Sequence, residues 1–260
     1  MTGGLMAHPA TAALNYWLVL YRRTWRTSVF SSFVIPLMWL TAIGLGVGSY
    51  IDRGSADLGV AYLSYLAPGL LASIVLQTGV EEMSWPVYSA IHWKKTYAPM
   101  LASPLRVGDI VLGHIGYVTF RMTITAGFFF VTMAVFGTLH SAWAPLALPA
   151  ALLTGLATAT PVYAFTAAVR QENRLPLLFR FVVVPLTLFS GVFFPVDGLP
   201  AVVRPLAWLS PLWHGVELCR AATLGTGAPL WPVLHVGYLA VWAVVGFVLV
   251  RTILTRKLVV

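Results

Sequence analysis

The most unusual polar side chain in the sequence is Arg121, which lies near the middle of a long apolar run. A cation at mid-membrane costs at least about 2.5 kcal/mol, so such residues usually face a cavity or a partner. His114, Tyr117 and Arg121 fall at i, i+3 and i+7, a spacing that predicts one polar stripe on a helix. The stripe could line a substrate pathway and meet an anionic headgroup. Alternatively, Arg121 is structural and bonds to a helix carbonyl or to a neighbouring chain.

A second group of chemically distinctive residues lies in a basic segment between two apolar runs. The candidate contact residues are Tyr88, Ile91, Trp93, Lys94, Lys95 and Tyr97. Aromatic side chains among cations are typical of a surface that binds a partner protein. The alternative is that the lysines are ordinary membrane-surface cations. We expect one short helix over residues 87–97, beginning directly after Pro86.

Motifs for catalysis, metal binding and nucleotide binding are missing from the sequence. No HExxH, GxSxG or GxxxxGK[ST] run occurs, and no two histidines are separated by three or four residues. Cys219 is the only cysteine, which excludes an intramolecular disulfide and a cysteine zinc site. His235, Tyr238 and Trp242 form another stripe, which we interpret as packing. We therefore expect no catalytic residue, metal or cofactor in this chain.

The composition indicates which elements must position these residues. Hydrophobic residues make up 59% of the 260 and charged residues only 9%, against about 25% charged in soluble domains. The apolar runs are continuous and about twenty residues long, which favours membrane helices over the alternating strands of a barrel. The net charge of +8 comes from Lys and Arg between these runs. This is the distribution of a membrane protein and gives no indication of nucleic-acid binding.

The sequence predicts an all-α integral membrane protein that forms a single domain over residues 1–260. An amphipathic helix at 10–28 should lie in the membrane interface, with its aromatic side in lipid. Six spans follow, at about 29–50, 57–78, from 107, within 145–169, at 175–194 and at 231–250. Lys and Arg concentrate before the first span and after the second, fourth and sixth. This bias predicts a multi-pass protein with both termini in the cytoplasm.

The stretch between the fifth and sixth spans is apolar but cannot form one straight helix. Prolines recur every five or six residues in it, and each interior proline removes a helical hydrogen bond. We predict short re-entrant helices over residues 195–221 on the outer side, although an external loop packed on the span ends is the alternative. The residues on which this prediction rests are Gly191, Pro195, Gly198, Pro200 and Pro211.

Three runs of the chain resemble the ABC-2 type permeases, the membrane subunits of bacterial ABC exporters. They are YLAPGLLA at 65–72, KKTYAPMLASPLRVGDIVLG at 94–113, and FSGVFFPVDGLPAVVRPLAWLSPLWHGVELCRA at 189–221. The chain is similar to the branch of nodulation protein J, a lipo-oligosaccharide export permease, and to drug-export permeases of the daunorubicin-resistance type. It departs from the nodulation branch at His114, where an acidic residue is expected.

The resemblance implies six spans, a second permease copy (identical or related), and two ATPase subunits that carry the ATP and magnesium. It also implies that the helix at 87–97 couples to the ATPase and that substrate moves near spans one, two and five. The expected function is export of an amphipathic molecule from the bacterial cytoplasm: a glycolipid, a lipid-linked oligosaccharide or a hydrophobic drug. The alternatives are a membrane-embedded lipid-modifying enzyme, which needs clustered catalytic groups, and a secondary transporter. A secondary transporter needs carboxylates inside the spans, whereas the sequence predicts them at span ends.

Overall fold

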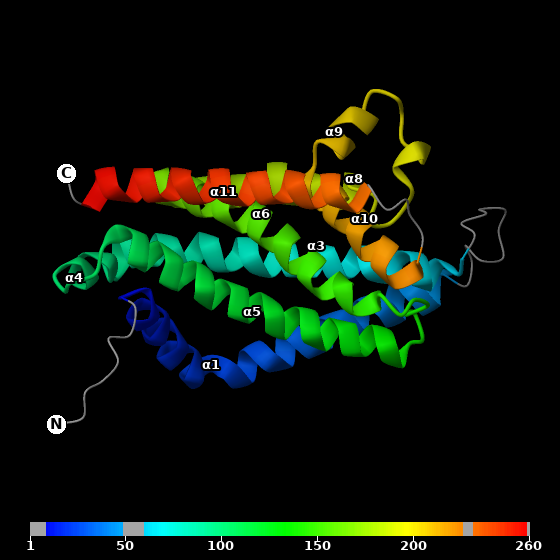
Figure 1. Cartoon of the computed structure of the whole chain (residues 1–260), viewed down its shortest axis with the longest axis horizontal. Coiled ribbons are helices and arrows are strands. Elements are labelled where there is room, and N and C mark those ends of the chain that lie inside the picture. The colour runs from blue at the N-terminus through cyan, green and yellow to red at the C-terminus, as the bar shows by residue number, and fades with distance from the viewer. Residues whose placement is uncertain (1–8, 49–59, 226–230, 259–260) are drawn as a thin grey trace.

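The computed structural model describes residues 9–48, 60–225 and 231–258, and all regular structure within them is helical. Long helices run side by side along the longest axis of the molecule (Figure 1). The start of α1, the short helix α4 and the end of α11 lie at one end, and α9 and α10 lie toward the other (Figure 1). The α-helices are α1 (Pro9–Trp39), α3 (Tyr62–Tyr88), α4 (Tyr97–Leu101), α5 (Val107–Val135), α6 (Ala147–Ala168), α7 (Arg174–Leu178), α8 (Val184–Phe189), α9 (Arg204–Trp208), α10 (Pro211–Leu224) and α11 (Trp231–Leu258). The other helical segments are η1 (Leu40–Val47), η2 (Ser89–Trp93) and η4 (Phe179–Val183), which are π-helical, and η3 (Ala144–Leu146) and η5 (Val196–Gly198), which are 3₁₀-helical.

Within the described residues, four helices are long and apolar enough to cross a membrane: Tyr62–Trp93, Val107–Val135, Ala144–Ala168 and Pro232–Leu258. They correspond to the predicted spans two, three, four and six, which confirms a multi-pass helical membrane protein. The predicted span one lies mostly on the end of α1 and on η1, and its last residues, 49–50, fall outside the described part. The predicted span five lies on the continuous helix formed by α7, η4 and α8, which is 16 residues long. The number six therefore stays a prediction.

Helix α3 is the centre of the bundle. It packs against α5, α6 and α10, and its Leu66, Leu71, Val75 and Met83 side chains are fully buried. Of its most apolar stretch, 78% is buried inside the protein, compared with 22% for α11. Helix α11 therefore presents most of its surface to lipid, whereas α3 is surrounded by other helices.

The contact between α6 and α11 depends on a glycine. A Cβ added to Gly246 would overlap Thr160 and the backbone of Pro161, so only glycine allows the helices to approach this closely. The Thr160 hydroxyl then donates to the Ala243 carbonyl across the contact, at 3.1 Å. This contact sets the position of α11 on the bundle.

The N-terminal helix differs from its prediction in two ways. Residues 10–28 and the start of the predicted first span form one helix, α1, which bends along its length (Figure 1). Its aromatic residues Trp17 and Tyr21 are buried against α5 and do not face lipid. The reason is that Gly113 of α5 leaves room for Ala13 and the α1 backbone at the same place, so protein covers the apolar face.

The predicted separate helix at 87–97 is also wrong. Pro86 lies inside α3, and the helix continues through η2 to Trp93. The wider turns of η2 are a known way to accommodate a disrupted hydrogen-bond ladder. The chain leaves the helix at residues 94–96, where Lys95 adopts a positive φ of 50°, and α4 then begins at Tyr97.

Candidate functional site

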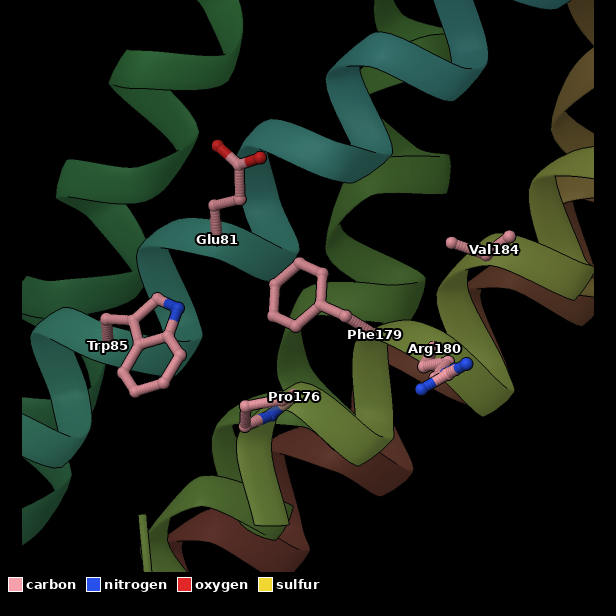
Figure 2. A pocket seen from close by; sticks show the side chains of 6 residues that line it. All are labelled: Glu81, Trp85, Pro176, Phe179, Arg180 and Val184. Atoms are coloured by element: carbon pink, nitrogen blue, oxygen red, sulfur yellow. The ribbon is translucent and has the colours of Figure 1, made fainter. Parts of the chain in front are cut away.

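A groove runs between α3 and the helix at 174–189, and Figure 2 shows the side chains that line it. Its volume is about 520 Å³. Helix α3 contributes Glu81 and Trp85, and the Phe179 ring projects between the two helices (Figure 2). Pro176, Arg180 and Val184 complete the lining from the other side. The site combines an indole, a phenyl ring, a carboxylate and a guanidinium in one open depression.

The two charged groups of the groove have no partner in the described residues. No ion pair or hydrogen bond is formed by Glu81 or Arg180 there, and both residues are exposed. The adjacent Glu82 is different, since its carboxylate is engaged by Arg121. A carboxylate and a guanidinium on apolar walls can bind hydroxyl or charged groups of a ligand whose rings stack on the aromatic side chains.

The predicted stripe on α5 does form, but it does not line this groove. The His114 side chain is fully buried, Tyr117 is 9% exposed, and the Arg121 side chain is 13% exposed. Rings from α1 cover all three, with Trp17 centred 4.2 Å from His114 and Tyr21 centred 5.3 Å from the Arg121 guanidinium carbon.

Arg121 has an acidic partner that the sequence interpretation missed. Its Nε atom donates to Oε1 of Glu82 over 3.0 Å. Glu82 was expected at the exit of the second span, but it lies inside the helix Tyr62–Trp93. The geometry favours a structural role for Arg121, with a carboxylate in place of the predicted carbonyl or neighbouring chain.

His114 belongs to a buried hydrogen-bond network that joins three helices. The Tyr97 hydroxyl lies 2.7 Å from Nδ1 of His114 and 2.8 Å from the hydroxyl of Tyr163. Burial raises the pKa of Tyr97 well above its usual value, and the neighbouring Tyr163 raises it further. Tyr97 was predicted as a surface contact, but it is fully buried and anchors α4 to α5 and α6.

Of the six predicted contact residues, only Trp93, Lys94 and Lys95 are exposed. We call residues 93–95 the exposed connector. Ile91 is partly buried against the core. Tyr88 is buried and donates its hydroxyl to the Arg170 carbonyl at 3.3 Å. The lysines therefore remain available to a partner, whereas the tyrosines on either side do not.

Two residues that the sequence interpretation did not single out position this connector. His92 Nε2 lies 3.1 Å from the Val169 carbonyl, and Lys257 donates to the Ala167 carbonyl at 3.0 Å. The Lys257 Nζ atom is also 3.3 Å from His92. Basic side chains commonly satisfy the last carbonyls of a helix, and here they join the ends of α3, α6 and α11.

Two arginines donate to carbonyls of the broken stretch after α8: Arg204, which bonds to Leu199 and Asp197, and Arg220. Gly191 turns the chain with a φ of 76°, Pro195 and Gly198 lie at η5, Pro200 precedes α9, and Pro211 begins α10. Arg220 of α10 is buried and donates to the carbonyls of Gly191 at 2.5 Å, Tyr65 at 3.3 Å and Val192 at 3.4 Å. Its guanidinium also lies 3.7 Å from the centre of the Tyr65 ring. The charge of Arg220 in an apolar stretch was the available signal, but the sequence interpretation used it only to predict orientation.

A histidine pair joins the same stretch to α11. The Nδ1 atoms of His214 and His235 are 2.7 Å apart, and Nε2 of His214 lies 3.0 Å from the Trp208 carbonyl. A carbonyl only accepts, so His214 must donate from Nε2, and its neutral form accepts from His235 at Nδ1. Burial, followed by the nearby His235, lowers the pKa of His214 to about 4. The sequence interpretation missed this pair because 21 residues separate its members.

The comparisons with known proteins agree over almost the whole chain. The model of the ABC-2 type transporter family matches residues 11–224. Nodulation protein J of Rhizobium leguminosarum bv. trifolii is 31% identical over 99% of both chains. Nodulation protein J of Rhizobium leguminosarum bv. viciae is 30% identical over 98% of this chain and 99% of its own. The inner membrane transport permease YadH of Escherichia coli (strain K12) is 24% identical over 93% of this chain and 96% of its own. With a match of this extent on a bundle of membrane-spanning helices, the chain belongs to the ABC-2 type transporter family.

Proposed function

We propose that this chain is the permease subunit of an ABC exporter and moves an amphipathic substrate outward, powered by a separate ATPase subunit. The family match over residues 11–224 is the observation that carries this proposal. The sequence has no phosphate-binding loop, so ATP and magnesium would be held by the partner. The similarity to nodulation protein J makes a lipo-oligosaccharide or a related glycolipid the first substrate to test.

The proposed topology has six spans with both termini in the cytoplasm. The apolar stretch at the end of α1 and in η1, together with the helix at 174–189, would supply the two spans beyond the four long helices. The stretch at 195–221 would re-enter the membrane from the outer side, and the Arg220 contacts support its burial. The concentration of Lys and Arg at the end that holds α4 supports the orientation.

The groove would form part of the substrate path, completed by a second permease copy. The helix at 174–189 supports this because its apolar side chains are largely uncovered within one chain. Phe181 is 68% exposed and Leu188 is 45% exposed, and only Leu175 and Val183 are buried in this helix. A partner copy, identical or related, would cover this surface and enclose Glu81, Trp85 and Arg180.

The exposed connector would couple the ATPase to the spans. Trp93, Lys94 and Lys95 project where the helix Tyr62–Trp93 ends. Movement of a docked ATPase would pass directly into α3 and, through Tyr97 and His114, into α5. The ATPase would have to bind one conformation better than the other for this movement to occur.

A secondary transporter remains the alternative that one observation favours. Glu81 lies inside the helix Tyr62–Trp93, not at its end, and intramembrane carboxylates are typical of proton-coupled or sodium-coupled transport. Replacing Glu81 by Gln separates the two functions. Transport by a coupled transporter would lose its dependence on an ion gradient, whereas transport by an exporter would still require ATP and no ion gradient, even if the substitution weakened substrate binding in the groove.

The test is co-purification and reconstitution with candidate ABC ATPase subunits from the same organism. We expect ATP hydrolysis to depend on the permease and to be stimulated by amphipathic substrates. Lys94→Ala combined with Lys95→Ala should uncouple hydrolysis from transport, and Arg22→Ala combined with Arg23→Ala is the matched control on another exposed cationic surface. Nucleotide binding by the isolated chain, or transport without any ATPase, would contradict the proposal.

A further inference from the structure

A second cavity lies behind the helix at 174–189, on the side away from the groove. Its volume is about 270 Å³. Leu178, Val182 and Leu186 of this helix line the cavity, whereas Pro176, Arg180 and Val184 line the groove, so the helix at 174–189 separates the two spaces. We call this space the inner cavity. It is lined by α3, α6, α11, the helix at 174–189 and the first residue of α10.

The inner cavity offers little to a polar ligand. The polar side-chain groups of its lining residues are the Thr158 hydroxyl and the Trp242 indole N–H, and no lining residue is charged. The Thr158 hydroxyl donates to the carbonyls of Thr154 and Gly155 in its own helix, at 3.1 and 3.0 Å. Apolar cavities of this kind stay dry and bind apolar molecules. Water and sugar headgroups are therefore excluded.

The cavity lies at the depth of the lipid chains. Leu76, Thr158 and Trp242 belong to the inner parts of three of the four candidate spans. Apolar residues at the rim are exposed: Phe165 by 37%, Trp242 by 39% and Val182 by 47%. The opening thus faces the hydrocarbon of the bilayer and not an aqueous space.

We propose that an acyl chain of a bilayer phospholipid occupies the inner cavity and supports the helix at 174–189 from behind. The space is smaller than the pockets of about 300–1,000 Å³ that take drug-sized molecules, and a linear chain can enter it sideways from the membrane. Only two residues of this helix are buried in the protein, so a lipid chain would supply much of its inner packing. The headgroup stays outside, since no charged residue lines the cavity. This inference depends on the membrane location and not on the export function.

The experiment counts phospholipids retained by the purified chain, using native mass spectrometry after extraction with native lipid. Thr158→Leu and Val162→Phe each place additional carbon atoms in the cavity. We expect each to lower the occupancy of one tightly held phospholipid by about tenfold. Val241→Leu is the matched control, because Val241 is 62% exposed on α11 and does not line the cavity. Unchanged lipid retention in both cavity variants would overturn the proposal.

A second measurement uses the unsubstituted chain and so does not depend on how the variants fold. A phospholipid with a photoreactive group in its acyl chain should crosslink to Val182 or Val162. The acyl chain in the cavity could belong to a bilayer phospholipid or to a transported glycolipid. Adding unlabelled glycolipid as a competitor distinguishes the two. Crosslinking confined to outward-facing residues such as Val241, or labelling by the glycolipid alone, would show that a bilayer phospholipid does not occupy the cavity.

Discussion

The two ends of the molecule bury polar groups in opposite ways. At the end that holds α4, the network of Tyr97, His114 and Tyr163 consists of neutral side chains that bond to one another. At the end that holds α10, the charged side chains of Arg204 and Arg220 donate to backbone carbonyls of a broken stretch. The interruption near α4 is short and returns to a helix within three residues, whereas the one after α8 leaves non-helical backbone inside the protein. Where backbone loses its helical partners away from water, a donor must come from elsewhere in the fold.

This difference implies a difference in how much each end tolerates substitution. The network at the α4 end consists of neutral groups, and replacing its Tyr97 hydroxyl removes one hydrogen bond from His114 and one from Tyr163. The α10 end holds a buried guanidinium that bonds three carbonyls and lies 3.3 Å from the Glu217 carboxylate. Removing a buried charged group that satisfies several partners costs more than removing a neutral one.

The largest effect is therefore expected for Arg220→Met. Three carbonyls would lose a hydrogen bond from the guanidinium, and Glu217 would lose its ion-pair partner. We expect a loss of about 3–5 kcal/mol in the free energy of unfolding. Chemical denaturation in detergent micelles measures it, with the exposed Arg256→Met as control. A stability close to that of the unsubstituted protein would mean that the broken stretch does not depend on this arginine, and the comparison between the ends would fail.

An intermediate effect is expected for Tyr97→Phe. His114 Nδ1 and the Tyr163 hydroxyl would both lose a partner in a fully buried place. An unsatisfied buried polar group costs about 1–3 kcal/mol. Tyr16→Phe is the control, since Tyr16 is 42% exposed. The double variant Tyr97→Phe with Tyr163→Phe tests whether the two hydroxyls depend on each other. If it were no less stable than Tyr97→Phe alone, the Tyr163 hydroxyl would contribute to stability only through Tyr97.

A smaller, pH-dependent effect is expected at the histidine pair. The pKa of His214 is lowered from 6.5 to about 4 in the folded protein, so the unfolded chain binds the proton more readily. The stabilising contribution is complete above pH 6.5 and is lost as the pH falls toward 4. Protonation would place hydrogens on both facing Nδ1 atoms and break their contact. Glu217 is the charged group near His235 and would partly offset this loss.

The measurement is the melting temperature between pH 7 and pH 4.5, compared with that of His214→Asn. Carboxylates elsewhere titrate in the same range, so only the difference between the two proteins reports the pair. If the melting temperatures of both proteins changed with pH in parallel, His214 would not contribute to the pH dependence of stability.

Hydropathy predicted the positions of α5, α6 and α11, because a long apolar run in a membrane protein has few structures other than a helix. Periodicity also predicted that His114, Tyr117 and Arg121 share one face. It could not predict what covers that face, since spacing along one helix carries no information about its neighbour. The burial of Tyr97, the Arg220 contacts and the His214–His235 pair depend on packing between segments 17 to 155 residues apart.

Substitutions in the exposed connector should have the smallest effect on stability and the largest effect on coupling to the ATPase. Lys94 and Lys95 make no contact that holds the fold, so replacing both by Ala should change the free energy of unfolding by less than about 0.5 kcal/mol. Lys95→Gly should even stabilise the chain slightly, because its φ of 50° suits glycine. Under the proposed function, both changes remove cations that contact the ATPase, so stimulated hydrolysis should fall while the melting curve stays in place. If the double Ala variant melted at a clearly lower temperature, the lysines would stabilise the fold as the buried Tyr88 and Tyr97 do. The distinction between buried structural residues and exposed contact residues would then be wrong.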